Sequence, residues 1–223
     1  MPISVEATVH ALRRWADAMD SAAPELNRLD AQLGDGDLGV TLAKCAAAVR
    51  TALDAAQYAD LGQLFKACAT GCARASGSSF GTLLTLTFMT LAKRLEGHPT
   101  LEWKDLSTEL RAALDVMSQR GGAKLGDKTV LDALAAAANA IEGLPDPRAQ
   151  HAAASAAVDA AIEHFRMQPN RMGRARMFAQ KSIGLDDPGM IAFRHMLASL
   201  TAAAFTDAAR PADPHIPPSA TKP

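Results

Sequence analysis

Three carboxylates lie within eight residues of one another in the segment Leu29–Gly39, interleaved with three glycines. Asp30, Asp35 and Asp37 would repel one another strongly, and a bound cation relieves such repulsion. Mg²⁺ takes oxygen ligands and completes its shell with phosphate oxygens, while glycines let a backbone approach a small ligand closely. The spacing differs from a calcium EF-hand loop, because Thr41 stands where that loop has its last Glu. We predict a magnesium and phosphate site here; an acidic turn between two helices is the open alternative.

Two further glycine-rich segments could contact a phosphate. Residues 75–82 are a turn of serines, glycines and a threonine that opens an apolar segment, and such a helix start offers hydroxyls and unpaired amides. Residues 121–129 combine four small residues with Lys124, Asp127, Lys128 and Thr129, but they lack the P-loop pattern. Each turn taken singly is also typical of an ordinary connection between helices.

A third polar stretch, residues 169–189, has no clear periodicity and contains Arg171, Arg174 and Arg176. These arginines fit either a solvated face or a loop that brings a guanidinium to a phosphate. The pair Asp187–Pro188 predicts the N-cap and first residue of a last helix.

The elements that must position the acidic, glycine-rich and arginine-containing segments are helices. Apolar residues recur at helical spacing and predict helices over residues 4–20, 22–33, 38–56, 60–74, up to about 96, 102–119, 129–142, 148–166 and 187–206. Residues 85–91 also alternate well enough for a strand, but we expect a helix, since no partner strand is visible. Asp30 would then stand in the last turn of a helix, which is an unfavourable place for an anion unless a cation is near. Residues 1–207 would form one helical domain and 208–223 a disordered, proline-rich tail.

The composition argues against several classes of protein. The net charge of -1 gives no basic surface for nucleic acid, and no apolar run is long enough to span a membrane. Three cysteines without framework spacing indicate a reducing compartment, so we expect a cytoplasmic protein. Cys68 and Cys72, one helical turn apart, fit core packing better than a metal site.

Five motifs together resemble the nucleotide-binding L subunit of dihydroxyacetone kinase. They are Gly34-Asp35-Gly36-Asp37-x-Gly39, Ser76-Gly77 with Phe80-Gly81-Thr82, Gly121-Gly122-Ala123-Lys124-x-Gly126-Asp127-Lys128-Thr129, Gly173-Arg174-Ala175, and Ser182-Ile183-Gly184 with Asp187-Pro188-Gly189. The resemblance implies an all-α barrel of about eight antiparallel helices, with ADP or ATP and two Mg²⁺ ions held by loops at one end. It also implies phosphoryl transfer to a short hydroxyketone held on a separate ketone-binding subunit. In some such systems a phosphotransfer protein rephosphorylates the bound ADP. A homodimer is left open.

The resemblance also implies roles for individual residues. Asp30, Asp35 and Asp37 would be the metal ligands and, with Arg174, the catalytic set. Apart from the resemblance, Arg174 or Lys128 could add a charge contact, because phosphoryl transfer needs charge neutralisation. Met117 and Gly126 would flank the adenine, while Arg174 and the turn Asp187–Gly189 would close over the nucleotide. The implied nucleotide-binding set is Leu38, Gly39, Thr41, Ser76, Gly77, Met117, Gly126, Thr129, Arg174, Asp187, Pro188 and Gly189.

Leu38 departs from the family pattern, which has a histidine after the third aspartate. Leucine cannot donate a hydrogen bond to a phosphate, so we expect Leu38→His to tighten nucleotide binding. Two alternatives to a kinase subunit follow. The chain could be a non-catalytic helical module that senses nucleotide and Mg²⁺, or a structural scaffold whose acidic loop is only a turn.

Overall fold

The computed structural model describes residues 1–200, and those residues are almost entirely helical. The α-helices are α1 (Val5–Leu33), α2 (Leu38–Ala55), α3 (Leu61–Ala75), α4 (Ser79–Arg94), α5 (Leu106–Gly121), α6 (Val130–Ala140), α7 (Pro147–Arg166) and α8 (Pro188–Ala198). Two 3₁₀ segments, η1 (Trp103–Asp105) and η2 (Arg174–Ser182), and two short strands, β1 (Ile3–Ser4) and β2 (Thr100–Leu101), complete the described elements. The predicted all-α fold is confirmed.

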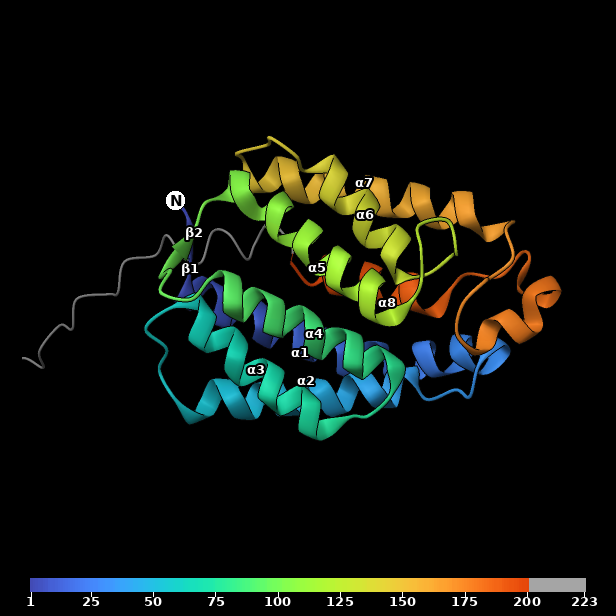
Figure 1. Ribbon diagram of the computed structural model, residues 1–223, viewed down its shortest axis with the longest axis horizontal. Helices are drawn as coiled ribbons and strands as arrows, with labels where there is room; N and C mark the ends of the chain where they lie inside the picture. The colour runs from blue at the N-terminus through green and yellow to red at the C-terminus, as the bar shows by residue number, and fades with distance from the viewer. Residues whose placement is uncertain (201–223) are drawn as a thin grey trace, which may run out of the picture.

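The helices form a closed barrel (Figure 1). Each helix packs against the next one along the chain, and α8 returns to pack against α1, which closes the ring. Short connections make neighbours antiparallel, so successive connections alternate between the two ends of the barrel. The α1–α2, α3–α4, α5–α6 and α7–α8 connections therefore share one end, on the right in Figure 1. The antiparallel pair β1–β2 lies at the opposite end, where Ile3 pairs with Leu101 and Ser4 with Thr100.

Helix α1 is continuous, so the predicted break between residues 20 and 22 is wrong. Pro24 lies inside the helix, where it removes one backbone donor. Met19, Ala22 and Leu26, on both sides of the expected break, are buried on the same stripe, with exposures of 0%, 5% and 0%. Burial of this continuous stripe against the barrel outweighs the local cost of the proline.

Helix α4 includes the residues whose alternation also suggested a strand, and the helical prediction is confirmed. Its threonines are compatible with a helix because their hydroxyls donate to carbonyl oxygens one turn back. Thr85 donates to Gly81 at 2.9 Å, Thr87 to Leu83 at 3.0 Å and Thr90 to Leu86 at 2.8 Å. The strand-like alternation thus comes from threonines satisfied inside the helix.

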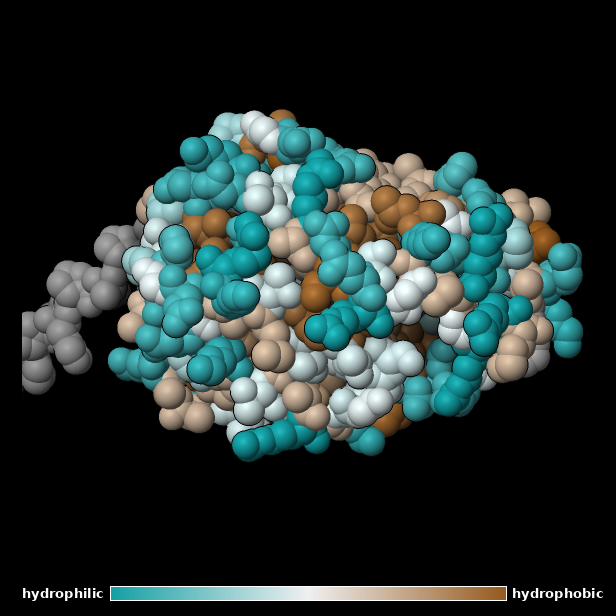
Figure 2. Space-filling view, viewed as in Figure 1, coloured by the Kyte–Doolittle hydropathy of each residue, from teal (hydrophilic) through white to brown (hydrophobic). Residues whose placement is uncertain are grey.

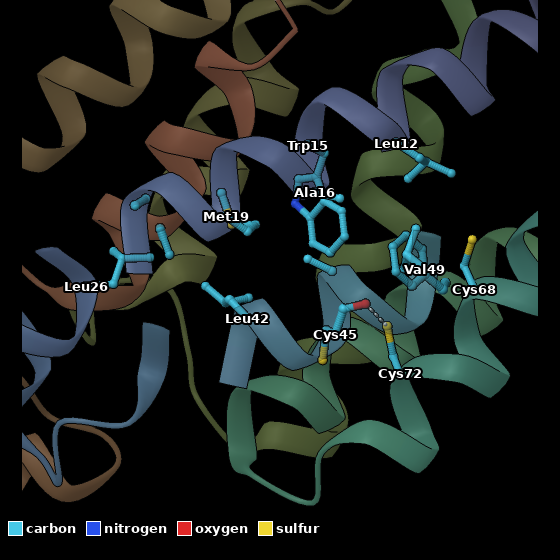
Figure 3. Packing of buried hydrophobic residues seen from close by; sticks show 14 of the residues in the cluster. Leu12, Trp15, Ala16, Met19, Leu26, Leu42, Cys45, Val49, Cys68 and Cys72 are labelled. Carbon is cyan, nitrogen blue, oxygen red and sulfur yellow. Dashed lines mark hydrogen bonds between the residues drawn. The ribbon is translucent and has the colours of Figure 1, made fainter. Parts of the chain in front are cut away.

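The barrel core is built on α1 and α2 (Figure 3). Trp15 of α1 meets Phe88 of α4 edge to face, with ring centroids 6.2 Å apart. All three cysteines are buried and free, and the Cys72 thiol donates to the Cys45 carbonyl oxygen. Burial raises the pKa of the Cys68 thiol to about 12. The cysteines are therefore core residues, as the sequence predicts for Cys68 and Cys72.

The last helix ends at Ala198, earlier than the predicted end near residue 206. The predicted tail, residues 208–223, lies outside the described residues. Within residues 1–200 no helix combines the length and apolarity that a membrane span requires. On the face shown in Figure 2, hydrophobic residues occur in small, separate groups.

Candidate functional site

One large cavity, of about 940 Å³, opens where the four connections share an end of the barrel. Residues from all four connections line it, which is a direct consequence of the up-and-down topology. The predicted site residues that line this cavity are Asp30, Asp35, Asp37, Leu38, Thr41, Ser76, Gly77, Met117, Thr129, Arg174, Asp187, Pro188 and Gly189. The predicted residues that do not line it are Gly39, Gly126 and Lys128.

The three aspartates of the α1–α2 connection form one cluster. One carboxylate oxygen from each of Asp30, Asp35 and Asp37 lies within 4.8 Å of the other two. Asp37 is the N-cap of α2, yet its carboxylate makes no capping bond, unlike the carboxylates of Asp60 and Asp146 at α3 and α7. An N-cap carboxylate left unused in this way is available to a ligand. The donor set, all carboxylate oxygens, fits Mg²⁺.

Asp30 has a second role that the sequence did not reveal. It stands in the last turn of α1, and its Oδ2 accepts the amides of Asp37 at 3.0 Å and Leu38 at 3.4 Å. Asp30 therefore replaces Asp37 as the cap of α2, and the positive end of that helix offsets its unfavourable place in α1. Its Oδ1 makes no hydrogen bond among the described residues, so one oxygen can still face a cation.

Arg174 meets this cluster from the connection between α7 and α8. Its guanidinium forms an ion pair with Asp35, although the two residues are distant in sequence. Gly173, directly before it, has φ of 62°, a conformation that favours glycine and turns the chain into η2. Of the three arginines in this stretch, only Arg174 lines the cavity, while Arg171 and Arg176 are exposed elsewhere. The arginine-to-phosphate prediction thus concerns Arg174 alone, and the other two form the solvated face.

The connection between α3 and α4 lines the cavity with hydroxyls and amides. Ser78 caps α4 by accepting the Gly81 amide at 3.1 Å, and Ser76 Oγ accepts the Ser78 amide at 3.2 Å. A Cβ on Gly81 would lie 2.7 Å from Ser76 Oγ, so only glycine fits there, whereas Gly77 faces open space. The amides of Ser79 and Phe80, which precede the capped Gly81 amide in α4, have no acceptor inside their helix. They can therefore donate to an anion in the cavity.

An apolar wall stands beside the polar part of the cavity. Met117, which is 6% exposed, belongs to a small core cluster beneath the site and lines the cavity. The larger apolar lining residues to which the sequence assigned no role are Leu33, Phe80, Leu83, Leu86, Val130, Leu131 and Met172. The sequence does contain a signal for some of these apolar residues, because several directly follow the glycine-rich segments. The wall suits a planar, weakly polar ring.

Leu38 and Gly39 begin α2 and belong mainly to the core. Leu38 is only 7% exposed and packs in the main hydrophobic cluster, although one edge lines the cavity. A Cβ on Gly39 would lie 2.1 Å from the Ala23 carbonyl oxygen, so glycine is required for α1 and α2 to pack closely. Thr41, one turn further, is 5% exposed and does reach the cavity.

The other predicted turn residues have definite structural partners. Thr129 caps α6 in a reciprocal capping box with Asp132, whose Oδ1 also accepts the Gly126 amide at 2.6 Å. Asp187 caps α8: Oδ1 accepts the Met190 amide at 2.9 Å, and Oδ2 accepts the Asn170 side-chain amide at 2.8 Å. Burial raises the pKa of Asp187 to about 6. The Asp187 carboxylate therefore shapes the cavity edge and is already engaged with protein donors.

Of the two alternatives predicted for a charge contact, Arg174 lines the cavity and Lys128 does not. Lys128 is fully buried, does not line the cavity, and donates to three backbone carbonyl oxygens. The sequence analysis missed two other cations, Lys44 and Arg120, which line the cavity and are exposed. A Cβ on Gly71 of α3 would lie 3.1 Å from the Ala48 carbonyl oxygen of α2, and the helices run antiparallel. Lys44 therefore faces the end of α3, directly before the serine turn.

Together these groups provide a cluster of oxygen ligands, amide and hydroxyl donors, three cations and an apolar wall in one cavity. A phosphate chain with its metal ions needs the oxygen ligands, the hydrogen-bond donors and the cations, and an attached aromatic ring needs the apolar wall. No histidine lines the cavity formed by the described residues, so the lining offers no imidazole as a general base.

Comparisons with known proteins agree with this geometry. The family model described as the DAK2 domain matches residues 32–202. The chain is 29% identical over 209 residues to the PEP-dependent dihydroxyacetone kinase, ADP-binding subunit DhaL, of Escherichia coli, covering 92% of this chain and 99% of that one. It is 32% identical over 180 residues to the D-erythrulose kinase of Mycolicibacterium smegmatis, covering 78% of this chain but only 31% of that one.

The solved structures give the same fold. The crystal structure of the native dihydroxyacetone kinase of C. freundii matches with a TM-score of 0.73 and 26% identity, covering 91% of this chain and 35% of that one. The structure of that enzyme in complex with AMP-PNP and Mg²⁺ matches with a TM-score of 0.72 and 24% identity. This chain thus spans about a third of the longer relatives and nearly the whole E. coli subunit.

Proposed function

The chain belongs to the DAK2 domain family, and from this premise we propose that it is the ADP- or ATP-binding subunit of a kinase for short ketoses. One observation carries the proposal: three aspartates, a serine–glycine turn and an arginine from separate connections line one cavity. The E. coli relative, which this chain matches along almost its whole length, is named an ADP-binding subunit. Relatives named for dihydroxyacetone and for erythrulose support a ketose of three or four carbons as the acceptor.

Each group in the cavity has a role in this proposal. Asp30, Asp35 and Asp37 hold two Mg²⁺ ions, which when bound neutralise phosphate charge and align the transferring group. The turn at Ser76 and Gly77 binds phosphate oxygens through its hydroxyl and the first amides of α4. The remaining nucleotide contacts of the proposal are Leu38, Thr41, Met117, Thr129, Pro188 and Gly189, all on the cavity lining.

Arg174 completes the proposed catalytic set. Its ion pair with Asp35 places the guanidinium at the edge of the acidic cluster, where it can stabilise charge on a phosphoryl group. Phosphoryl transfer depends mainly on alignment and charge neutralisation. Because the described cavity lining has no histidine, we assign activation of the acceptor hydroxyl to a separate ketone-binding subunit. The name "subunit" of the E. coli relative supports such a partner.

The donor and the setting are finer parts of the proposal. The E. coli relative is named PEP-dependent, which supports rephosphorylation of bound ADP by a phosphotransfer protein in place of exchange with ATP. Three free, buried cysteines support a reducing, cytoplasmic setting. A homodimer is compatible with the proposal, and gel filtration with light scattering tests it directly.

Calorimetry with Mg·ADP tests the binding half of the proposal. The wild-type chain should bind Mg·ADP, and Asp37→Asn should not, because it removes one carboxylate from the proposed metal site. Asp37 makes no capping bond, so unfolding of α2 could not explain the loss of binding. Transfer of phosphate from ATP to dihydroxyacetone or erythrulose in the presence of a ketone-binding subunit tests the catalytic half. Failure of the wild-type chain to bind Mg·ADP would contradict the whole proposal and favour the scaffold.

A non-catalytic nucleotide and Mg²⁺ sensor is the second candidate. Leu38 favours it, because a buried leucine stands where the family has a side chain able to donate to a phosphate. A sensor binds Mg·ADP but transfers no phosphate with any partner subunit. Binding without transfer, measured with a partner that is active with another family member, would therefore select the sensor.

A further inference from the structure

A buried lysine joins the two sides of the cavity. Lys128 is 0% exposed, and its ammonium donates to the carbonyl oxygens of Arg166 at 3.1 Å, Gln168 at 2.8 Å and Ser182 at 2.8 Å. An ammonium has three protons, so the described contacts use its full donor capacity. Lys128 thus contacts no ligand in the cavity, and its partners show what it holds.

Those three carbonyl groups lie at the two ends of one segment. Residues 167–187 leave α7, pass through η2 and return to α8, and they carry Arg174 to the acidic cluster. The carbonyls at 166 and 168 come before η2, and the carbonyl at 182 ends it. The Lys128 ammonium therefore ties the beginning of this segment to its end and fixes both to the α5–α6 connection.

Neighbouring bonds strengthen the same junction. Asn170 is 1% exposed, and its side-chain amide donates to the Lys128 carbonyl oxygen at 2.9 Å and to Asp187. The Asn170 amide nitrogen donates to Ser182 Oγ at 2.8 Å, and the Arg171 amide donates to the Asp127 carbonyl oxygen at 3.0 Å. We call Lys128, Asn170, Ser182 and Asp187 the buried polar junction.

The backbone of Lys128 indicates that its side chain, and not the turn, is needed at this position. Lys128 has φ of 61° and is the only non-glycine residue with positive φ in residues 1–200. Glycine adopts this conformation without cost, and Gly126 does so two residues earlier. A lysine in this conformation is strained and persists only where its contacts compensate.

We propose that Lys128 is a positioning residue for phosphoryl transfer, which holds residues 167–187 so that Arg174 reaches the acidic cluster and the bound phosphates. This proposal rests on the proposed nucleotide-binding function. Its physical basis is that Arg174 is exposed and stands in a 3₁₀ segment that is held by contacts near its two ends. The buried polar junction, the backbone bond from Arg171 to Asp127, the packing of Met172 on the smaller core cluster and the ion pair with Asp35 therefore fix its place.

A double-mutant cycle tests whether Lys128 acts through Arg174. Lys128→Met, Arg174→Ala and the double variant are compared by calorimetry with Mg·ADP, at a temperature where every variant is folded. Each single variant should bind about tenfold or more weakly, the effect of losing one hydrogen bond to a charged group. The double variant should bind no more weakly than the weaker single variant, because a released segment no longer delivers Arg174.

Gln150→Met is the matched control. Gln150 is 3% exposed and donates to the carbonyl oxygens of Trp103 and Leu144 at the opposite end of the barrel. Its substitution also removes long-range bonds from a buried side chain, and it should leave Mg·ADP affinity and the effect of Arg174→Ala unchanged. If Lys128→Met does not fold, Ser182→Ala, which removes one hydroxyl from the same junction, takes its place in the cycle.

The outcomes separate the two proposals. Additive effects of Lys128→Met and Arg174→Ala would overturn the positioning role while leaving nucleotide binding intact. A wild-type chain that does not bind Mg·ADP would overturn the proposed function and the role of Lys128 in transfer together.

Trypsin tests the physical claim without any ligand. Residues 171–181 contain four cleavage sites, at Arg171, Arg174, Arg176 and Lys181. In Lys128→Met, cleavage in this stretch should be several-fold faster than in the wild type, at a temperature where both are folded, and Gln150→Met should match the wild type. Equal cleavage rates in Lys128→Met and the wild type would overturn the proposal that Lys128 holds the segment.

Discussion

Replacing Leu38 with histidine tests whether the residue that begins α2 serves mainly to pack the core or to contact a ligand in the cavity. The family resemblance predicts that a histidine here adds a donor to the phosphates and tightens binding. The structure adds a cost, because the Leu38 side chain is 7% exposed and packs in the main hydrophobic cluster. An imidazole that turns towards a phosphate must leave that cluster.

The two effects have similar size and opposite sign. Burial of a leucine side chain contributes about 1.5–3 kcal/mol, so the ligand-free Leu38→His variant should lose about 2 kcal/mol of unfolding free energy. A hydrogen bond from histidine to a charged phosphate returns about 1.5–3 kcal/mol at most, and only in the nucleotide complex. We therefore expect a less stable free protein whose stability with saturating Mg·ADP approaches that of the wild type.

Urea unfolding with and without saturating Mg·ADP measures both effects. Val40→His is the control, because Val40 is 44% exposed, lies in the same turn of α2 and does not line the cavity. It should change neither the free stability nor the gain from ligand. A Leu38→His variant as stable as the wild type without ligand would refute the packing argument. A smaller gain from Mg·ADP than the wild type shows would refute the donor argument.

Asp37→Asn should abolish the stabilisation by Mg·ADP in thermal unfolding. The ligand-free variant should be as stable as the wild type or slightly more stable, because the substitution relieves repulsion among the three carboxylates. A lower melting temperature of the ligand-free variant would contradict this reasoning. Burial raises the pKa of Asp187 to about 6, so the folded carboxyl keeps a proton that the unfolded one releases. Wild-type unfolding free energy should therefore fall from about pH 4 to pH 6 relative to Asp187→Asn, by up to about 3 kcal/mol, and a pH-independent difference in chemical denaturation would refute the assignment. Lys44→Gln should weaken ADP binding about three- to tenfold and AMP binding less, whereas Lys66→Gln, outside the cavity, should change neither; equal losses for both nucleotides would exclude a phosphate contact. Deleting residues 209–223 should leave the melting temperature and ADP affinity unchanged, and a drop of several degrees would show that these residues pack on the barrel.

Most of the fold could be predicted because its signals are local. The period of apolar residues places the starts of α2, α3, α6 and α7 within about a residue of the structure, and Asp187 caps α8 as predicted. Pro24 misled the prediction, because a proline in sequence cannot report the buried stripe that continues through it. The small β1–β2 pair was also missed, since its two strands are too short to carry a pattern.

The site was predicted less evenly, for a physical reason. Motif residues at the loops, such as Asp35 and Ser76, could be recognised by type and spacing. Whether a motif residue faces the cavity depends on its packing against residues distant in sequence. The spacing of residues within a motif carries no information about that packing. Lys128 and Gly39 stand in motifs yet support the fold, one through three carbonyl groups and the other through close approach to Ala23. Lys44 lies between motifs, and only the antiparallel pairing of α2 with α3 brings it to the cavity.

The position of the N-terminus limits how this barrel can be tethered. Because α1 begins at the end of the barrel away from the cavity, a segment attached before it starts at the wrong end to reach the site (Figure 1). Helix α1 has 29 residues, which at about 1.5 Å each makes the barrel roughly 44 Å long. A linker that returns along this length needs about 13 extended residues at roughly 3.4 Å each. A fused neighbour on a shorter linker would have to meet the cavity of another copy, and its effective concentration at its own cavity would fall to near zero.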